Sequence, residues 1–131
     1  QRTNVAHGGT LYQDIATQKP GARVHRDAAV YDLNFHEVDV LPGTHLASLL
    51  PAGRHRINSV HHQGITALAP GSAVEAVSPD DGVIEAIRHA GRSWVAGVQW
   101  HPEFHRPELG VVDDTPLLRD FLQAARAARQ R

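Results

Sequence analysis

The amino-acid sequence predicts an α/β fold, in which a mixed sheet has helices on its flanks. Three features favour this class: segments 36–40 and 73–78 alternate polar and apolar residues, segment 94–100 is almost wholly apolar, and segment 115–131 is amphipathic. Alternation with a period of two is typical of half-buried strands, whereas apolar residues three or four apart indicate a helix. With 131 residues, 41% of them hydrophobic, the chain has the size of one domain.

The first half of the chain is expected to contain two short helices. Residues 1–7 have the character of a helix end, because the glycine pair at 8–9 is a strong C-terminal stop. Residues 44–50 form the second predicted helix, in which Thr44 is placed to cap the N-terminus and Pro51 to end it.

Four strands are predicted between residues 36 and 88, at 36–40, 56–60, 73–78 and 83–88. The last two are separated by the sequence PDDG at 79–82, which has the composition of a tight turn. We therefore expect them to pair as an antiparallel hairpin.

The C-terminal third is predicted to form a buried strand followed by a helix. Segment 94–100 is apolar nearly throughout, which predicts burial on both faces, with Trp94 and Trp100 as core residues. In the helix, Thr115 is the expected cap and Pro116 takes the first position. The apolar stripe of this helix contains Leu117, Leu118, Phe121, Leu122 and Ala125.

Composition excludes several classes of partner. The 13 basic and 14 acidic residues give a net charge of -1, so neither nucleic acid nor an anionic membrane is expected. No apolar run approaches the roughly 20 residues that span a bilayer, and the N-terminus lacks the apolar core of a secretory signal. We therefore expect a cytoplasmic protein. The absence of cysteine excludes disulfides and thiolate metal sites.

The sequence is rich in histidine, with ten in 131 residues. We expect most of these side chains on the surface, because they share no spacing typical of metal ligands. This group comprises His25, His36, His45, His55 and His89.

One histidine differs from the rest because a carboxylate follows it at the end of a predicted strand. His101 and Glu103 are two residues apart, and residues so spaced in an extended segment project from the same face. The carboxylate can hold the imidazole in one tautomer, while the imidazole takes a proton from a thiol and returns it to a leaving amine. The plain alternative is a histidine that only forms a hydrogen bond at the strand end, with Glu103 on the surface.

The nucleophile that such a pair serves is not in the sequence. The chain has no cysteine, and it begins at Gln1 rather than at a methionine. We therefore expect it to be the C-terminal portion of an enzyme whose nucleophile lies upstream.

Three segments resemble one protein family. Residues 97–104, GVQWHPEF, resemble the GxQxHPE signature of class I glutamine amidotransferases. Residues 58–65, NSVHHQGI, resemble the NSxHHQxI segment of one branch, the gamma-glutamyl-gamma-aminobutyrate hydrolases. Residues 1–15, QRTNVAHGGTLYQDI, resemble the segment that follows the nucleophile in that branch. The three motifs occur in family order and extend over essentially the whole chain.

The resemblance implies the C-terminal part of a flavodoxin-like amidotransferase domain, in which residues 1–131 lack the N-terminal strands and the nucleophile elbow. It implies a Cys-His-Glu triad, with His101 as base and acid, Glu103 as its orienting group, and the cysteine four residues before Gln1. The reaction is hydrolysis of a γ-glutamyl amide through a thioester, without metal or organic cofactor. This chain alone is then expected to be inactive. The implied substrate-binding residues are Gln1, Ser59, Val60 and His61, the last three acting largely through backbone groups.

Other readings of the sequence remain open. Imidazoles at 61–62 and at 101 and 105 could hold a metal ion, although no third ligand is indicated by spacing. The chain could also be a non-catalytic remnant or a split subunit that binds γ-glutamyl compounds or an N-terminal partner chain. The leaving group, the choice between hydrolysis and ammonia transfer, and assembly into a homo-oligomer are not determined by the sequence.

Overall fold

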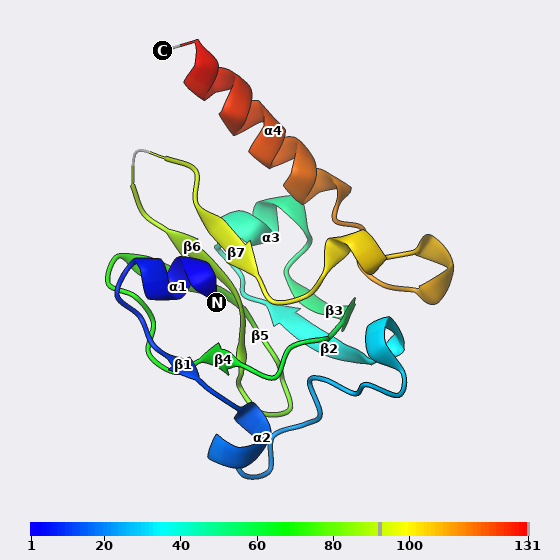
Figure 1. Ribbon diagram of the computed structural model, residues 1–131. Helices are drawn as coiled ribbons and strands as arrows, with labels where there is room; N and C mark the ends of the chain where they lie inside the picture. Colours follow the sequence, from blue (N-terminus) through cyan, green and yellow to red (C-terminus); the bar gives the residue numbers. More distant parts are fainter. Residues whose placement is uncertain (92, 131) are drawn as a thin grey trace.

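The computed structural model describes residues 1–91 and 93–130, and its centre is a five-stranded sheet of order β3-β2-β5-β6-β7 (Figure 1). The α/β class and the flanking helices are confirmed. A mixed sheet was predicted, and it would contain parallel strand pairs. Every strand pair among the described residues is antiparallel. The sheet strands are β2 (Phe35–Val40), β3 (Gly53–Asn58), β5 (Ser72–Val77), β6 (Ile84–His89) and β7 (Ala96–Val98).

A smaller two-stranded sheet joins the N-terminal segment to the middle of the chain. It pairs β1 (Leu11–Tyr12) with β4 (Gly64–Ile65), in antiparallel register. Asn4, which is fully buried, supports this junction, because its amide donates to the carbonyl oxygens of Thr10 and Ala67 at 3.1 and 3.0 Å.

The predicted hairpin is confirmed, since β5 and β6 pair in antiparallel register. In its turn, Gly82 adopts a φ of +69°, and the Asp81 carboxylate accepts a hydrogen bond from the Val83 amide at 3.1 Å. The strand predicted at 56–60 runs earlier, from Gly53 to Asn58. That shift leaves residues 59–61 in the loop beyond the strand end.

The helices are short apart from the last. They are α1 (Arg2–Ala6), α2 (Ile15–Gln18), α3 (His45–Leu49) and α4 (Thr115–Arg129), with 3₁₀ turns η1 (Tyr31–Leu33), η2 (Pro102–Phe104) and η3 (Pro107–Leu109). The Thr44 cap is confirmed, because its hydroxyl accepts from the Ala47 amide at 3.2 Å. The Thr115 cap is wrong: Asp114 is the N-cap of α4, and Asp113 accepts from the Thr115 amide at 3.0 Å.

The core lies between the sheet and α3. Trp100 is buried there, as predicted, and burial of each large apolar side chain contributes about 1.5–3 kcal/mol. The cluster comprises Val38, Val40, Leu46, Leu50, Ile57, Ala76, Ala86 and Trp100. The prediction for 94–100 is wrong in two respects: only Ala96–Val98 is a strand, and it is half-buried. Its apolar composition predicted burial on both faces, but the residues on both faces of β7 are only half-buried.

Helix α4 extends away from the sheet (Figure 1) and leaves part of its apolar stripe uncovered. Leu118, Phe121 and Leu122 are 57%, 47% and 44% exposed, whereas Leu117 packs against the core. Trp94 is half-buried and packs against Phe121 rather than in the core. Within the described ranges, the helices are too short or too polar to cross a membrane.

Candidate active site

His101 lies just beyond β7, and the buried side chain of Asn58 fixes its backbone. The Asn58 Oδ1 atom accepts from the His101 amide at 2.8 Å, and Asn58 Nδ2 donates to the His101 carbonyl at 2.9 Å. Because Asn58 ends β3, these two hydrogen bonds join the end of one strand to the segment after another. Asn58 belongs to the motif at 58–65, but no pattern in the sequence indicated this role.

The side chains of His101 and Glu103 contact each other, but through a 3₁₀ turn rather than from one face of the extended segment that was predicted. His101 Nδ1 is 2.8 Å from Glu103 Oε1, and the side chains are 41% and 62% exposed. The 3₁₀ turn η2, which has Pro102 at its first position, brings the carboxylate back to the ring. A hydrogen bond to His101 lowers the pKa of Glu103 below its ordinary value. Since an ionised carboxylate only accepts, Nδ1 carries the proton, and Nε2 of the neutral ring presents a lone pair.

Gln1 lies between the other two predicted motifs. Its Nε2 atom donates to the Gln63 carbonyl oxygen and to Gln99 Oε1, each at 3.1 Å. Gln99 precedes His101 by two residues, and Gln63 follows His61 by two. The structure therefore brings together the N-terminal segment, the segment after β3 and the segment after β7.

The residues after β3 differ in which backbone groups are free. Asn34 engages Ser59 on both sides: its carbonyl accepts from the Ser59 amide at 2.8 Å, and its Nδ2 donates to the Ser59 carbonyl at 3.0 Å. Among the described residues, the amides of Val60 and His61 donate no hydrogen bond to another backbone group, and the same holds for the amides of His62 and Gln63. Backbone donors are therefore available along residues 60–63.

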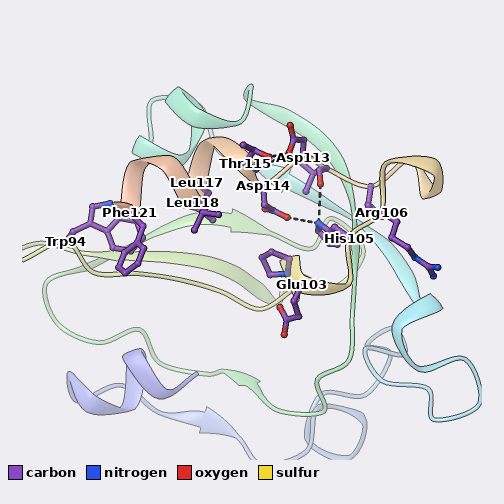
Figure 2. A pocket seen from close by; sticks show the side chains of 13 residues that line it. Trp94, Glu103, His105, Arg106, Asp113, Asp114, Thr115, Leu117, Leu118 and Phe121 are labelled. Atoms are coloured by element: carbon purple, nitrogen blue, oxygen red, sulfur yellow. Dashed lines mark hydrogen bonds and ion pairs between the residues drawn. The ribbon is translucent and has the colours of Figure 1, made fainter. Parts of the chain in front are cut away.

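A cleft of about 770 Å³ lies between α4 and residues 102–114 (Figure 2). Glu103 is on its wall, but Gln1, Ser59, Val60 and His61 are not. The space beside Gln1 and Gln99 is only about 10 Å³, which is about the size of one water position. Among the described residues, neither of these two spaces is a ligand-sized cavity enclosed by the predicted substrate-binding residues.

Another histidine of the same segment is buried and was not predicted. His105 Nδ1 is 2.6 Å from Asp114 Oδ2 (Figure 2). His105 Nε2 is 3.2 Å from Asn58 Oδ1. His105 and Asn58 together support the turn that carries His101. The alternative metal motif at 61–62 is not assembled as a pair, because His61 is buried whereas His62 is exposed. In the alternative at 101 and 105, His101 Nδ1 contacts Glu103 and His105 Nδ1 contacts Asp114.

The prediction of surface histidines is wrong for His25 and His36. Both are buried, together with His61 and Glu85. Burial is the main cause that lowers the pKa of each of these two imidazoles below its ordinary value. No spacing in the sequence could have indicated this group, because its members are spread over 61 positions, from residue 25 to residue 85.

Comparisons with known proteins agree with the sequence motifs. A family model described as Peptidase C26 matches residues 1–103. Protein NtpR of Enterococcus hirae is 41% identical over 105 residues, which are 79% of this chain and 43% of that protein. Gamma-glutamyl-gamma-aminobutyrate hydrolase PuuD of Escherichia coli is 37% identical over 117 residues, which are 85% of this chain and 45% of that protein. The chain therefore spans less than half the length of these relatives.

Solved structures show the same fold at low sequence identity. A Thermoplasma acidophilum protein assigned to GMP synthase has a TM-score of 0.68 at 15% identity, over 97% of this chain and 53% of its own. A glutamine amidotransferase from Thermotoga maritima has a TM-score of 0.54 at 12% identity, over 96% and 44%. Together with the family match over residues 1–103, these likenesses show that the chain belongs to the Peptidase C26 family of class I glutamine amidotransferase-like proteins.

Proposed function

We propose that His101 and Glu103 are the base and its orienting carboxylate in the hydrolysis of γ-glutamyl amides. The observation that carries this proposal is the 2.8 Å contact between His101 Nδ1 and Glu103 Oε1, on a segment whose backbone Asn58 fixes at both polar groups. A histidine held in this way has one tautomer and one orientation, as a general base requires.

In the proposed reaction, a cysteine thiol attacks the γ-carbonyl carbon while His101 Nε2 takes the thiol proton. The tetrahedral intermediate then collapses to a γ-glutamyl thioester, and His101 gives its proton to the departing amine. Water, deprotonated by His101, hydrolyses the thioester to glutamate and free thiol. Because the chain contains no cysteine, this thiol has to come from outside the 131 residues.

The substrate class follows from the neighbouring residues and from the relatives. The backbone amides of Val60 and His61 are donors suited to the carboxylate and carbonyl groups of a γ-glutamyl unit, and the Gln1 amide, which donates to Gln63 and Gln99 in this chain, lies beside them. A relative named gamma-glutamyl-gamma-aminobutyrate hydrolase, 37% identical, favours an amine such as γ-aminobutyrate as the leaving group. We propose hydrolysis rather than ammonia transfer to a synthase, and a cytoplasmic location for this small-molecule reaction.

A second candidate function is non-catalytic binding. Two observations favour it: the chain has no cysteine, and the space beside Gln1 is only about 10 Å³. In this case the chain binds γ-glutamyl compounds or an N-terminal partner chain without cleaving a bond.

Two experiments distinguish the candidate functions: sequencing of the source gene upstream of Gln1 and an assay of γ-glutamyl amide hydrolysis. The hydrolase proposal predicts a cysteine codon four positions before the Gln1 codon, in frame. It also predicts that the protein encoded by the whole reading frame releases γ-aminobutyrate from its γ-glutamyl amide, whereas the 131-residue chain does so no faster than its His101→Ala variant. A stop codon or another residue at that position, or a whole-frame protein without hydrolysis, establishes the non-catalytic candidate.

A further inference from the structure

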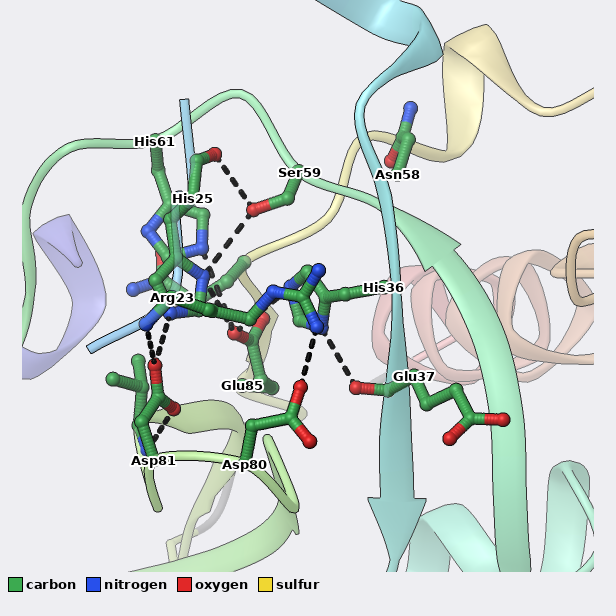
Figure 3. A network of polar contacts seen from close by, with 12 residues as sticks. Arg23, His25, His36, Glu37, Asn58, Ser59, His61, Asp80, Asp81 and Glu85 are labelled. Carbon is green, nitrogen blue, oxygen red and sulfur yellow. Dashed lines mark hydrogen bonds and ion pairs between the residues drawn. The ribbon is translucent and has the colours of Figure 1, made fainter. Parts of the chain in front are cut away.

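A second group of histidines lies in the interior of the molecule, apart from His101. His25, His36 and His61 surround the carboxylate of Glu85, and one ligand atom from each of the four lies within 4.8 Å of the others (Figure 3). Their exposed fractions are 3%, 4%, 5% and 1%. They come from four separate segments: the loop before η1, strand β2, the loop between β3 and β4, and strand β6.

Each imidazole uses its outer nitrogen in a hydrogen bond to a group that can only accept. His25 Nε2 is 2.8 Å from Asp81 Oδ2. His36 Nδ1 is 2.7 Å from the Glu37 carbonyl, and His61 Nδ1 is 2.8 Å from the Gln63 carbonyl. The proton of each neutral ring is therefore on the outer nitrogen, and the inner nitrogen presents a lone pair.

The three inner nitrogens converge on one oxygen atom. His25 Nδ1, His36 Nε2 and His61 Nε2 lie 3.5, 3.5 and 3.6 Å from Glu85 Oε1. These distances exceed the roughly 2.7–3.2 Å of a hydrogen bond. Within the described residues, His36 Nε2, His61 Nε2 and both Glu85 oxygens have no hydrogen-bond partner. Lone pairs that face one another in a buried space need a positive charge between them.

We propose that His25, His36, His61 and Glu85 form a binding site for one divalent transition-metal ion of the Zn²⁺ type. In tetrahedral zinc sites the ligand bonds are about 2.0–2.1 Å long, so neighbouring ligand atoms lie roughly 3.3–3.4 Å apart. The three separations of 3.5–3.6 Å from Glu85 Oε1 are close to this value, and the other pairs of ligand atoms lie within 4.8 Å, so the imidazoles close in on the ion when it binds. Three imidazoles and a carboxylate are ligands that suit zinc better than calcium or magnesium.

The surroundings match those of a metal site in two further respects. Metal-bound histidines commonly donate their other N–H to a carboxylate or a carbonyl, as all three do here. The charges also balance, because Glu85 and Asp81 together neutralise a divalent ion.

With four protein ligands, the site is closed and its role is structural. The ion ties the loop that carries His25 and the loop that carries His61 to strands β2 and β6. The His61 loop also contains Ser59, whose hydroxyl donates to the His25 carbonyl at 2.7 Å. Metal binding therefore fixes the segment that begins at the end of β3.

The test is metal titration of the 131-residue chain after removal of metal with a chelator. We expect one equivalent of Zn²⁺ to bind and Co²⁺ to give the visible absorption of a tetrahedral site. At a thousandfold excess of free Zn²⁺ over Kd, Tm is expected to rise on the order of 10 °C. The His36→Gln, His61→Gln and Glu85→Gln variants are expected to lose the tetrahedral Co²⁺ spectrum.

The matched control is His62→Gln, which replaces the exposed neighbour of His61 and is expected to keep stoichiometry and spectrum unchanged. A stripped chain that folds only after Zn²⁺ is added also supports the site, with circular dichroism as the readout. The proposal is overturned if the folded chain binds no Zn²⁺. It is equally overturned if the His36→Gln and Glu85→Gln variants bind Co²⁺ with the unaltered spectrum.

Discussion

His101 and Glu103 lie at the surface, whereas Glu85 and the three imidazoles around it are buried. Both sites place histidine beside a carboxylate, but water reaches only the first. An exposed pair gains little stability from its contact and can exchange protons with a substrate. A buried carboxylate among imidazoles affects stability strongly and needs a compensating cation. Burial, rather than residue type, therefore separates a candidate proton-transfer site from a candidate metal site.

The largest difference is expected when each carboxylate is removed. Glu85→Ala should lower the free energy of unfolding of the zinc-loaded chain by about 3–5 kcal/mol, because it leaves a buried cavity and an uncompensated charge. Glu103→Ala should lower it by less than about 1 kcal/mol, because that carboxylate is exposed. Urea denaturation of the two variants measures both values, and equal losses contradict the comparison.

The pair of His105 and Asp114 is less deeply buried than the cluster, with side chains 7% and 10% exposed. The Asp114 side chain contacts His105 and accepts from Trp100 Nε1 at 3.0 Å, and the residue is the N-cap of α4 without a side-chain capping bond. We expect Asp114→Ala to lower the free energy of unfolding by about 2–4 kcal/mol. Asp113→Ala, at the exposed neighbour, is the control with a smaller loss in the same urea experiment. A smaller effect at 114 than at 113 refutes this ranking.

The buried side chain of Asn58 holds the backbone of His101 in the exposed pair. Replacing Asn58 therefore tests whether the position of His101 depends on this buried residue. Asn58→Ala breaks two hydrogen bonds to the His101 backbone and leaves those polar groups without their partner. We expect a loss of about 2 kcal/mol. In amide hydrogen exchange, the His101 amide should lose protection. An unchanged exchange rate at His101 means that Asn58 does not hold the site.

The smallest effect concerns pH dependence at the exposed pair. The pKa of Glu103 is lowered in the folded state by its hydrogen bond to His101. Its small contribution to stability is therefore present above the unfolded value of about 4.3 and is lost as the pH falls through the folded pKa. His101→Ala should raise the pKa of Glu103 towards the ordinary value, measured by carboxyl ¹³C NMR titration. His55→Ala, elsewhere on the surface, should leave it unchanged.

The sequence predicted local elements well where the hydrophobic pattern agrees with the turn and capping residues that flank it. The hairpin of β5 and β6, strand β2 and the Thr44-capped helix are all confirmed, because alternation, turn composition and a capping residue act over a few neighbouring positions. Strand β7 was predicted too long, because apolar composition alone does not specify which neighbours will cover a strand.

Contacts between segments far apart in the sequence were not indicated by alternation, turn composition or capping residues. The Gln1 contacts to Gln63 and Gln99 unite three motifs that only the family resemblance connected. The resemblance placed His101 and Glu103 as partners but gave no role to Asn58 or His105, which support them. Glu85 is on a strand predicted correctly, yet its burial among three histidines depends on four segments meeting. Such a cluster is a property of the tertiary fold.

The most direct test of the proposed division between the two sites is the kcat of the His101→Ala variant. It is measured on the protein encoded by the whole reading frame, with the γ-glutamyl amide of γ-aminobutyrate as substrate. We predict a loss of kcat of at least about 10³-fold, with Tm within about 2 °C of the unsubstituted protein, because His101 is exposed and acts in proton transfer. A kcat within tenfold of the unsubstituted protein contradicts the assignment of His101 as the base.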